Sequence, residues 1–535
     1  MGYWLDRAPP TQLETHYGDR RVRCFVERPA SVQAMLVEAV AQAPQREALV
    51  CGDRRFRWRE VDHEVSRLAG GLAALGVAAG DRVALLLSNR AEFVLLLLAI
   101  ARLGAITVPL NIREQTPELA YGLAQCGAVA LVFDADLAAR LPDANDVPAL
   151  RHRIAVGGSA AGALRYDALR ARLARHDVSS VREDDVAVIL YTSGTTGRPK
   201  GAMLTHLGIV HSALHYLHAM RLVETDRCIA SVPLSHVTGL VAMIAAMLAC
   251  RGTLIVMNAF KAADFLRLAA RERMTCTLMV PAMYNLCLLE SDFDMHDLSS
   301  WRLGGYGGAP MPPPTIERLA QKLPALALMN AYGATETTSP ATLMPPHLTR
   351  EHGDSVGLAV ACGEIQVVDD DGAAVAPGES GEVWIGGPMV VPGYWHNPEA
   401  TAREFSQGFW HSGDVGSLDA SGFLRVFDRK KDMINRGGYK VYGAEVEAVL
   451  AAHPAVVESA VIGTPCPVLG ERVHAFVTLR EPSVSADALR AFCAAHLADY
   501  KVPESFTLQD APLPRNANGK ALKRVLRERL TAERR

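Results

Sequence analysis

Short apolar segments alternate with helical patterns, and this alternation limits the fold more than any other feature of the sequence. Residues 82–87 (RVALLL) form an apolar run of strand length, a helical pattern begins near Ala91, and residues 105–109 (AITVP) form the next run. The rhythm continues with apolar runs at 128–133, 228–232, 252–257 and 276–280. Alternation of this kind predicts an α/β fold with layered β-α-β subdomains.

The pattern changes in the last third of the chain. Residues 363–427 hold short alternating segments separated by Gly, Pro and Asp-Gly turns, which predicts an antiparallel, β-barrel-like subdomain. A charged stretch, DRKKD at 428–432, comes next. Two helical patterns and two strands after it predict a small α+β unit. We therefore expect a large N-terminal domain (1–428), a hinge (429–432) and a small mobile C-terminal domain (433–535).

Composition excludes several classes of protein. At roughly 100–200 residues per domain, 535 residues are enough for more than one domain. The net charge of −3 gives no electrostatic reason to expect nucleic acid as a partner. The ten cysteines form no CxxC pair, so neither a zinc site nor a disulfide framework is indicated.

The sequence also gives no sign of secretion or membrane insertion. The N-terminus lacks a basic segment followed by an apolar one, so no signal peptide is expected. The apolar runs at 93–101 and 237–250 are shorter than the ~18 residues of a spanning helix and are interpreted as buried helices. The expected location is the cytoplasm.

A loop rich in hydroxyl groups and glycine points to a phosphate-bearing ligand. Residues 188–201 read VILYTSGTTGRPKG, so that an apolar strand leads into hydroxyl groups, two glycines and Lys200. Glycine lets backbone N–H groups approach phosphate oxygens, and the lysine adds positive charge. The spacing is not that of a Walker loop, because only two residues separate Gly194 from Gly197.

The loop resembles the signature of the adenylate-forming superfamily, which contains acyl-CoA synthetases, luciferases and the adenylation domains of peptide synthetases. Further motifs of that family follow in order: PLSHVTG (233–239), GGAPMP (307–312), YGATE (332–336), GFWHSGD (408–414), DRKKDMINRGGYKVYGAEVE (428–447) and PRNANGK (514–520). The resemblance covers roughly residues 30 to 525. It implies ATP, Mg²⁺ and coenzyme A as cofactors and a small-molecule carboxylic acid as substrate.

The implied reaction has two steps. A carboxylate attacks the α-phosphorus of ATP to give acyl-AMP and pyrophosphate, and the thiol of coenzyme A then displaces AMP. The acid, with a pKa of about 4.3, is already ionised, so the first step needs charge neutralisation and alignment rather than a base. The resemblance assigns the phosphates to Thr192, Ser193, Gly194, Thr195, Thr196, Gly197 and Lys200.

The other motifs carry the remaining roles that the resemblance implies. Glu336 is the Mg²⁺ ligand, and Lys520 bridges the reacting carboxylate and the α-phosphate; Thr196 and His236 complete the catalytic set. The expected nucleotide and coenzyme A contacts are Gly307, Gly308, Ala309, Tyr332, Gly333, Thr335, Asp414, Arg429, Gly437 and Gly438. Lys431 matches the hinge position.

The acid itself is the least constrained part. The expected pocket consists of His236, Val237, Leu240, Tyr284, Gly305, Tyr306, Thr337 and Pro340, which are mostly apolar or small. Such a pocket suits a hydrophobic monocarboxylate, whether medium-chain, long-chain, branched or aromatic. His236 stands where amino-acid-activating relatives carry Asp, which argues against an amino acid. Gly443 replaces a frequent Pro and is expected to loosen the start of the helix after it.

Two alternatives remain open at this point. The enzyme could pass its adenylate to a carrier protein instead of coenzyme A, or the fold could serve as a nucleotide sensor without catalysis. The presence of Lys520, Glu336, Asp414 and Arg429 argues against the sensor. The sequence does not decide between a monomer and a homodimer.

Overall fold

The computed structural model describes residues 3–172, 180–192, 198–480, 484–515 and 521–533. Two compact units emerge from its packing. The larger holds residues 1–311, 315–365 and 384–411, and the smaller holds 312–314, 366–383 and 412–535. The mixed α/β fold with a large and a small part confirms the predicted fold class.

The first sheet of the larger unit has seven strands in the order β11-β10-β6-β5-β7-β8-β9. Strands β6, β5, β7 and β8 are parallel, as the β-α-β rhythm predicted, whereas β10 and β11 form an antiparallel hairpin. The strands are β5 (Arg82–Leu86), β6 (Ile106–Pro109), β7 (Ala130–Asp134), β8 (His152–Val156), β9 (Leu164–Arg165), β10 (Val186–Thr192) and β11 (Lys200–Thr205).

The second sheet of this unit has a parallel core in the order β16-β15-β14-β12-β13-β3, with β4 antiparallel at its edge. Parallel strands need covered faces, and their apolar runs reflect this burial. The strands are β3 (Glu47–Cys51), β4 (Arg54–Arg57), β12 (Arg227–Ala230), β13 (Thr253–Val256), β14 (Cys276–Met279), β15 (Leu303–Tyr306) and β16 (Ala327–Tyr332), followed by β17 (Thr342–Leu343) and β18 (Gly357–Ala359).

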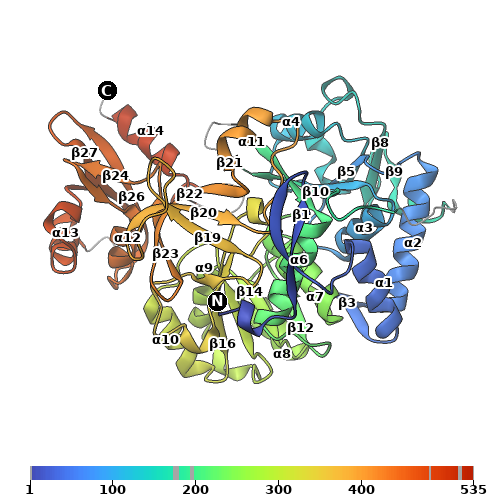
Figure 1. The fold of residues 1–535 in the computed structure, drawn as a ribbon, viewed down its shortest axis with the longest axis horizontal. Coiled ribbons are helices and arrows are strands. Elements are labelled where there is room, and N and C mark those ends of the chain that lie inside the picture. The colour runs from blue at the N-terminus through green and yellow to red at the C-terminus, as the bar shows by residue number, and fades with distance from the viewer. Residues whose placement is uncertain (1–2, 173–179, 193–197, 481–483, 516–520, 534–535) are drawn as a thin grey trace. The chain divides into compact units, whose positions relative to one another are not determined.

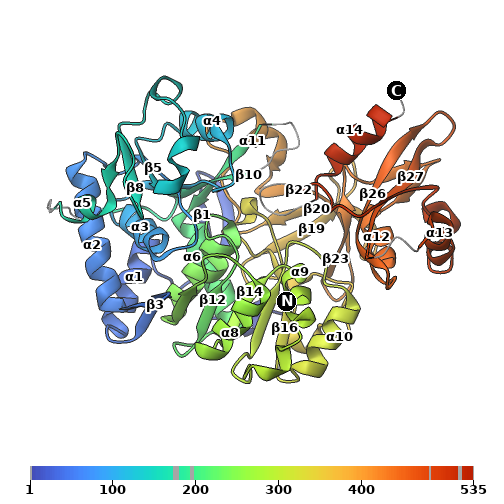
Figure 2. The same ribbon diagram turned by 180° about the vertical axis from the view of Figure 1, so that it is seen from behind.

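Helices cover these sheets in the larger unit (Figures 1 and 2). All twelve residues of α3 are buried, which explains why its sequence is apolar on every side. The helices are α1 (Val32–Gln42), α2 (Trp58–Ala74), α3 (Ala91–Arg102), α4 (Thr116–Cys126), α5 (Tyr166–Arg170), α6 (His206–Ala219), α7 (Ala246–Cys250), α8 (Ala262–Arg271), α9 (Pro281–Leu289), α10 (Pro313–Lys322) and α11 (Pro398–Glu404).

The second apolar run, at 237–250, is a buried helix as well, but its first part has an unexpected form. Thr238–Ala245 is a π-helix, labelled η4, which leads directly into α7. Each π turn holds one more residue than an α turn, and such turns are frequent at functional sites. No helix in the described part of the chain combines the length and the apolarity that crossing a bilayer requires.

An N-terminal hairpin, which the sequence analysis did not predict, lies along α6 (Figure 1). Its strands are β1 (Thr11–His16) and β2 (Arg20–Phe25). The backbone N–H of Phe25 donates to Nε2 of His211 at 3.2 Å, and the Phe25 ring stacks on that imidazole. A two-stranded ribbon is marginal alone, so these contacts with α6 stabilise it.

The smaller unit contains an antiparallel part and an α+β part. Its elements are β23 (Phe423–Arg429), β24 (Ile434–Arg436), β25 (Tyr439–Val441), α12 (Gly443–Ala451), β26 (Val456–Cys466), β27 (Gly470–Leu479), α13 (Ala486–Ala494), β28 (Ser505–Gln509) and α14 (Lys523–Glu533). Strands β19 (Glu364–Val368), β20 (Ser380–Gly386) and β22 (Phe409–Leu418) contribute residues to both units. The hinge predicted at 429–432 stays a prediction.

Gly443 begins α12 in a crowded place. A Cβ atom there would lie 3.0 Å from Nζ of Lys523, 3.0 Å from the Val461 carbonyl oxygen and 3.2 Å from a carboxylate oxygen of Asp428. That carboxylate also accepts a hydrogen bond from the Ala444 backbone N–H at 3.3 Å. The glycine therefore allows the start of the helix to pack closely, which its sequence alone did not reveal.

Candidate active site

The predicted adenine and magnesium motifs follow two adjacent parallel strands. Gly307 and Gly308 come directly after β15, and Glu336 comes four residues after the end of β16. In open α/β sheets, ligands bind at the carboxyl ends of the strands. A Cβ atom on Gly307 would lie 2.4 Å from the Ala331 carbonyl oxygen, and Gly308 has a φ of +77°. Both positions therefore require glycine for the backbone to follow this path.

The predicted phosphate loop joins β10 to β11. Thr192 and Lys200 are partners in the hairpin register and close the two ends of the loop. The residues Ser193, Gly194, Thr195, Thr196 and Gly197 lie outside the described residues. The structure therefore gives the frame of the loop, and the phosphate contacts of these five residues stay a prediction.

Glu336 is buried beside this frame. Only 7% of the residue is exposed. Its Oε1 accepts hydrogen bonds from the hydroxyl of Thr192 at 3.2 Å and from that of Tyr394 at 3.0 Å. The structure thus brings together the predicted magnesium ligand and the first residue of the predicted phosphate loop, which are 144 positions apart in sequence.

Two further residues, which the sequence analysis missed, extend this network. The hydroxyl of Tyr394 lies 2.7 Å from Oε2 of Glu404, and Nζ of Lys200 lies 2.5 Å from the same oxygen. Burial opposes ionisation of Glu404, but the hydrogen bonds from Lys200, Tyr394 and Arg403 together with the charge of Lys200 outweigh it, so the pKa of that carboxyl is lowered. Burial, and next the charge of Glu336, raise the pKa of Tyr394, which keeps the phenol as a donor.

The donor set fits a magnesium ion at Glu336. The network contains two carboxylates, Glu336 and Glu404, and the lysine pairs with the second. In the described part of the chain Glu336 has no cationic partner, and its Oε2 accepts no hydrogen bond. Mg²⁺ is commonly held by one or two carboxylates together with substrate phosphates. A buried carboxylate with one free oxygen beside a phosphate loop meets that description.

The fold explains how Tyr394 and Glu404 reach the network. Tyr394 forms a β-bridge with Ala202 of β11, and the N–H of Trp395 donates to the Gly201 carbonyl oxygen at 2.7 Å. Helix α11 then begins at an Asn397 cap with Pro398 at its first position, and it ends at Glu404. The cap is readable from sequence. The proximity of its last residue to Lys200 arises only from tertiary packing.

His236 lies two residues before the π-helical segment. Its Nε2 lies 3.3 Å from the side-chain nitrogen of Asn111. A Cβ atom on Gly239 would lie 2.4 Å from the Pro233 carbonyl oxygen, so the turn that carries His236 requires glycine there. The neighbouring pocket candidates differ in exposure, since Val237 is half-buried and Leu240 is buried.

The other predicted pocket residues lie deep in the larger unit. Tyr284 is fully buried, its hydroxyl donates to the Gly305 carbonyl oxygen at 2.8 Å, and its ring stacks on Trp301. Tyr306 belongs to the same apolar cluster. Thr337 is also buried, and its hydroxyl accepts from the Ala334 N–H at 2.9 Å. Pro340 is buried after a cis peptide bond. Their contacts with an acid stay a prediction.

The remaining nucleotide candidates of the larger unit belong to the two motifs at the carboxyl ends of β15 and β16. Tyr332 ends β16 and is half-buried, as is Thr335. Gly333 and Ala309 are exposed. The carboxyl edge of β15 and β16 thus presents small or accessible groups, which is what a flat base lying against backbone requires.

The smaller unit holds a second predicted group. Asp414 on β22 lies opposite Arg429 on β23, and Nε of the arginine is 2.7 Å from Oδ1 of the buried carboxylate. The guanidinium also donates to the Ser412 carbonyl oxygen at 3.3 Å. The structure therefore pairs the residue predicted to hold the ribose with the residue predicted to contact ribose and phosphates.

Charges fix the chain on both sides of the predicted hinge residue. Nζ of Lys430 lies 3.0 Å from Asp370 and 3.3 Å from Glu382, and Asp432 pairs with Arg527 of α14 at 2.9 Å. Lys431 between them is exposed and makes no ion pair with any described residue. Its neighbours are thus attached to different elements of the smaller unit.

The smaller unit also holds the two glycines predicted to line the path of coenzyme A. Gly437 and Gly438 form the two-residue turn between β24 and β25, with φ of +60° and +91°. Such values fit a type I′ hairpin, which favours glycine at both positions. Lys520 lies outside the described residues, so its catalytic role stays a prediction.

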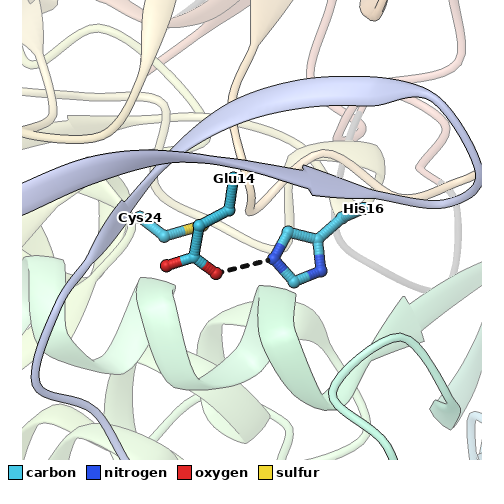
Figure 3. A group of neighbouring side chains, drawn as sticks. All are labelled: Glu14, His16 and Cys24. Carbon is cyan, nitrogen blue, oxygen red and sulfur yellow. Dashed lines mark hydrogen bonds and ion pairs between the residues drawn. The ribbon is translucent and has the colours of Figure 1, made fainter.

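One group of metal-ligating side chains lies away from this site. Ligand atoms of Glu14, His16 and Cys24 in the N-terminal hairpin all lie within 4.8 Å of one another (Figure 3). Both oxygens of Glu14 are already occupied, because each accepts one hydrogen bond from Arg28 and a second from Gln12 or His16.

The protonation states of that group also disfavour a metal. The Arg28 hydrogen bond lowers the pKa of Glu14 to about 2, while burial raises the pKa of Cys24 to about 12. A cysteine binds a metal as the thiolate, and the raised pKa of Cys24 keeps its thiol protonated, so Cys24 is poorly suited as a metal ligand. We interpret the group as a structural ion-pair network.

The comparisons with known proteins agree with the geometry. Residues 36–395 match the AMP-binding enzyme family, and residues 445–520 match the AMP-binding enzyme C-terminal domain. A long-chain-fatty-acid–CoA ligase of Mycobacterium tuberculosis is 36% identical, with 93% of this chain and 98% of the relative covered. A feruloyl-CoA synthase of an Amycolatopsis species is also 36% identical, with 92% and 98% covered.

A solved structure supports the same conclusion. The o-succinylbenzoate coenzyme A synthetase of Bacillus subtilis, in complex with its acyl-adenylate intermediate, matches with a TM-score of 0.83. It is 32% identical and covers 94% of this chain and 98% of its own. The same synthetase has been solved with ATP and magnesium ion, with a TM-score of 0.82.

The chain belongs to the AMP-binding enzyme family of adenylate-forming enzymes. Within it, the protein is an AMP-forming acid–CoA ligase that uses ATP and Mg²⁺ to activate a carboxylic acid as acyl-AMP and then transfers the acyl group to coenzyme A.

Proposed function

We propose that the acid is a hydrophobic monocarboxylate, and that Glu336 organises its activation. The observation that carries the proposal is the buried Glu336 carboxylate, which has one oxygen free beside the start of the phosphate loop. There it would hold Mg²⁺, which supplies charge neutralisation between the phosphates when bound. Tyr394 and Thr192 hold the carboxylate in place through its other oxygen.

The residues around this carboxylate would divide the binding of ATP. Thr192, Lys200 and the loop between them would hold the phosphates, with Thr335 at the α-phosphate. Gly307, Gly308, Ala309, Tyr332 and Gly333 would line the adenine, Asp414 would accept hydrogen bonds from both ribose hydroxyls, and Arg429 would contact ribose and phosphates. A carboxylate has two acceptor oxygens, which fits a vicinal diol.

The two half-reactions would use different parts of the chain. Lys520 would bridge the acid and the α-phosphate in the first step, since a flexible point charge suits that task. Rotation about Lys431 would then bring Gly437 and Gly438 to the pantetheine path for thioester formation. The separate attachments of Lys430 and Asp432 support a pivot at the residue between them.

The apolar nature of the candidate pocket supports a hydrophobic acid. Leu240 on the π-helical segment and Val237 directly before it are apolar, and His236 precedes them as the proposed gate between the acyl pocket and the thiol path. The relatives named above act on long-chain fatty acids and ferulate, so both a long-chain and an aromatic acid belong in the test.

A panel of acids tests the proposal. Long-chain, medium-chain, branched and aromatic acids, with acetate and an amino acid as controls, are each incubated with ATP and Mg²⁺, and AMP is measured with and without coenzyme A. We expect AMP formation with hydrophobic acids, accelerated by coenzyme A. Preferred turnover of acetate or the amino acid would contradict the proposed acid, whereas adenylate without thioester for every acid would favour a carrier-protein acceptor.

A cytoplasmic location and a homodimer complete the proposal. All ten cysteines are free thiols and nine are buried, which fits a reducing compartment. Sedimentation of the purified protein at several concentrations tests the dimer, and a single species with the mass of one chain would contradict it.

A further inference from the structure

A cavity lies at the amino ends of two strands of the parallel sheet, whereas the predicted nucleotide motifs follow the carboxyl ends of the same strands. Its volume is about 610 Å³, and its wall includes Leu303 and Ala327, the first residues of β15 and β16. The nucleotide motifs follow the last residues of these strands. Since β16 has six residues and successive residues rise by about 3.3 Å, its first and last Cα atoms lie about 16–17 Å apart. The cavity is therefore separate from the adenylate site.

The wall of this cavity carries positive charge without a carboxylate. Arg7, Arg221 and Arg302 line it, and neither Asp nor Glu is among the lining residues that the structure describes. Arg302 pairs with Asp226, which lies outside the lining. Arg7 and Arg221 form no ion pair with any residue in the described ranges, and both are exposed. Two positive charges are thus available to an anion.

A buried donor in the same wall lacks a partner. His215 is 2% exposed, and its Nε2 accepts a hydrogen bond from the Cys362 N–H at 3.3 Å. Burial lowers the pKa of this imidazole well below its usual value, so the ring is neutral and its hydrogen is on Nδ1. Among the described residues Nδ1 has no hydrogen-bond partner. An unsatisfied buried donor lowers the stability of the fold, and an acceptor atom of a ligand would satisfy it.

Aromatic side chains make up much of the remaining wall. Tyr3, Trp4 and Phe25 line the cavity. Trp4 is held in place by a hydrogen bond from its indole N–H to the Leu343 carbonyl oxygen at 2.9 Å, and Phe25 by its stacking on His211. Fixed aromatic rings beside cationic groups are suited to a ligand with a flat apolar body and an anionic head.

We propose that this cavity binds a small organic anion, with its acidic head at Arg221 and Arg7, an acceptor atom within reach of His215, and a flat apolar body against Trp4 and Phe25. The head is a carboxylate, sulfonate or phosphate, because these share the oxygen acceptors that guanidinium groups recognise. The proposal does not depend on which acid the ligase activates.

The test uses 2-naphthalenesulfonate, which has the required shape and charge, with the full-length protein. Hydrogen exchange followed by mass spectrometry locates the ligand. We expect protection of the peptides that carry residues 3–8 and 215–221. Protection confined to other segments, or none at millimolar ligand, would overturn the proposal.

Variants show whether the charge matters. Arg221→Glu should weaken binding at least ~10-fold, as expected for loss of one charge-assisted hydrogen bond. Arg273→Glu is the matched control, because Arg273 is also an exposed arginine with positive φ, 50° against 48° for Arg221, and lies outside the cavity. Arg7→Glu repeats the test at a second position. Equal affinity of Arg221→Glu and Arg273→Glu would contradict the proposed head site.

Two analogues separate the parts of the ligand. Sulfate carries the charge without the apolar body, and 2-naphthalenemethanol carries the body without the charge. Each should protect the two peptides at least ~10-fold more weakly than the sulfonate. If either one alone matches the sulfonate, the combined recognition that we propose is wrong. In the absence of 2-naphthalenesulfonate, Arg221→Glu and Arg7→Glu should both keep the wild-type rate of ATP–pyrophosphate exchange.

Discussion

Two glutamates of the larger unit, the half-buried Glu14 and the buried Glu336, have opposite surroundings. Glu14 in the N-terminal hairpin accepts hydrogen bonds at both oxygens, two of them from Arg28, which itself also pairs with Glu183. Glu336 beside the predicted phosphate loop accepts hydrogen bonds at one oxygen only, from two hydroxyl groups, and has no cation among the described residues. A carboxylate whose two oxygens both accept hydrogen bonds from the protein has a structural role. A carboxylate with one oxygen that accepts none is available to a ligand.

Replacing Glu336 gives the largest expected effect. Glu336→Gln keeps the shape and removes the charge, so acid-dependent ATP–pyrophosphate exchange should fall by about 10²–10³-fold, the cost of one group that stabilises developing charge. The exchange rate is measured across a range of Mg²⁺ concentrations. Glu14→Gln is the matched control and should retain the wild-type exchange rate. A loss of less than about tenfold in Glu336→Gln would contradict the proposed role.

Removing Arg28 tests the other side of the comparison. Arg28→Met leaves Glu14 and Glu183 without their cation, which should lower the free energy of unfolding by about 2–3 kcal/mol, less than for a fully buried pair because both carboxylates are partly exposed. Chemical denaturation measures the change. Arg46→Met, which breaks an exposed pair with Glu224, should change it by less than about 0.5 kcal/mol. Similar values for both variants would refute the interpretation.

The hairpin network and helix α6 are expected to lose stability in different ranges of acid pH. Burial lowers the pKa of His206 to about 4 and of His211 to about 3, so the unfolded chain binds more protons below pH 6.5. Stability should therefore fall from about pH 6.5 downward, by about 2 kcal/mol for each of these two histidines at pH 5. Glu14, with its pKa of about 2, contributes stability above its unfolded value of 4.5 and loses it between pH 4.5 and 2.

The two steps can be measured by denaturation at a series of pH values. His211→Gln should weaken the first step, between pH 6.5 and 4, and leave the second. Glu14→Gln should remove part of the second step. A pH profile that is flat from 7 to 5 would show that these histidines do not govern the acid response.

The smallest expected effect comes from the hydroxyl of Tyr394. Tyr394→Phe removes one of the two hydrogen bonds that hold Glu336, so the Mg²⁺ concentration for half-maximal activity should rise by about threefold to tenfold, with little change in the maximal rate. Tyr17→Phe removes the hydrogen bond to Thr205 at the hairpin and should leave the Mg²⁺ dependence unchanged. Equal Mg²⁺ dependence in both variants would show that Tyr394 does not support the proposed magnesium site.

The sequence predicted most of the parallel architecture and its motifs. The apolar runs at 82–87 and 276–280 became β5 and β14, because a strand buried on both faces is apolar throughout its length. The motifs at Gly307 and Glu336 were identified from the sequence, and the structure shows that they follow adjacent strands. Lys520 shows the opposite case, since only the family pattern speaks for it.

What the sequence did not predict depends on packing between distant segments. Glu404 has no local pattern that distinguishes it from any other helix-terminal acid, and its role follows from its distance to Lys200. The N-terminal hairpin has alternating residues, but its stability depends on α6, which begins 181 residues after the end of β2. Properties of this kind are pairwise in space and leave no periodic trace in the chain.

The π-helical segment at Thr238–Ala245 carries Leu240, a residue of the proposed acid pocket, and its form affects how that proposed pocket can change. A π turn is equivalent to one residue inserted in an α-helix. Deleting one residue there would let the segment return to α-helical geometry, in which successive side chains are about 100° apart. The side chains inside the segment, Leu240 among them, would then change direction in one step. Evolution or design can thus rebuild the wall after His236 by a single deletion instead of many substitutions.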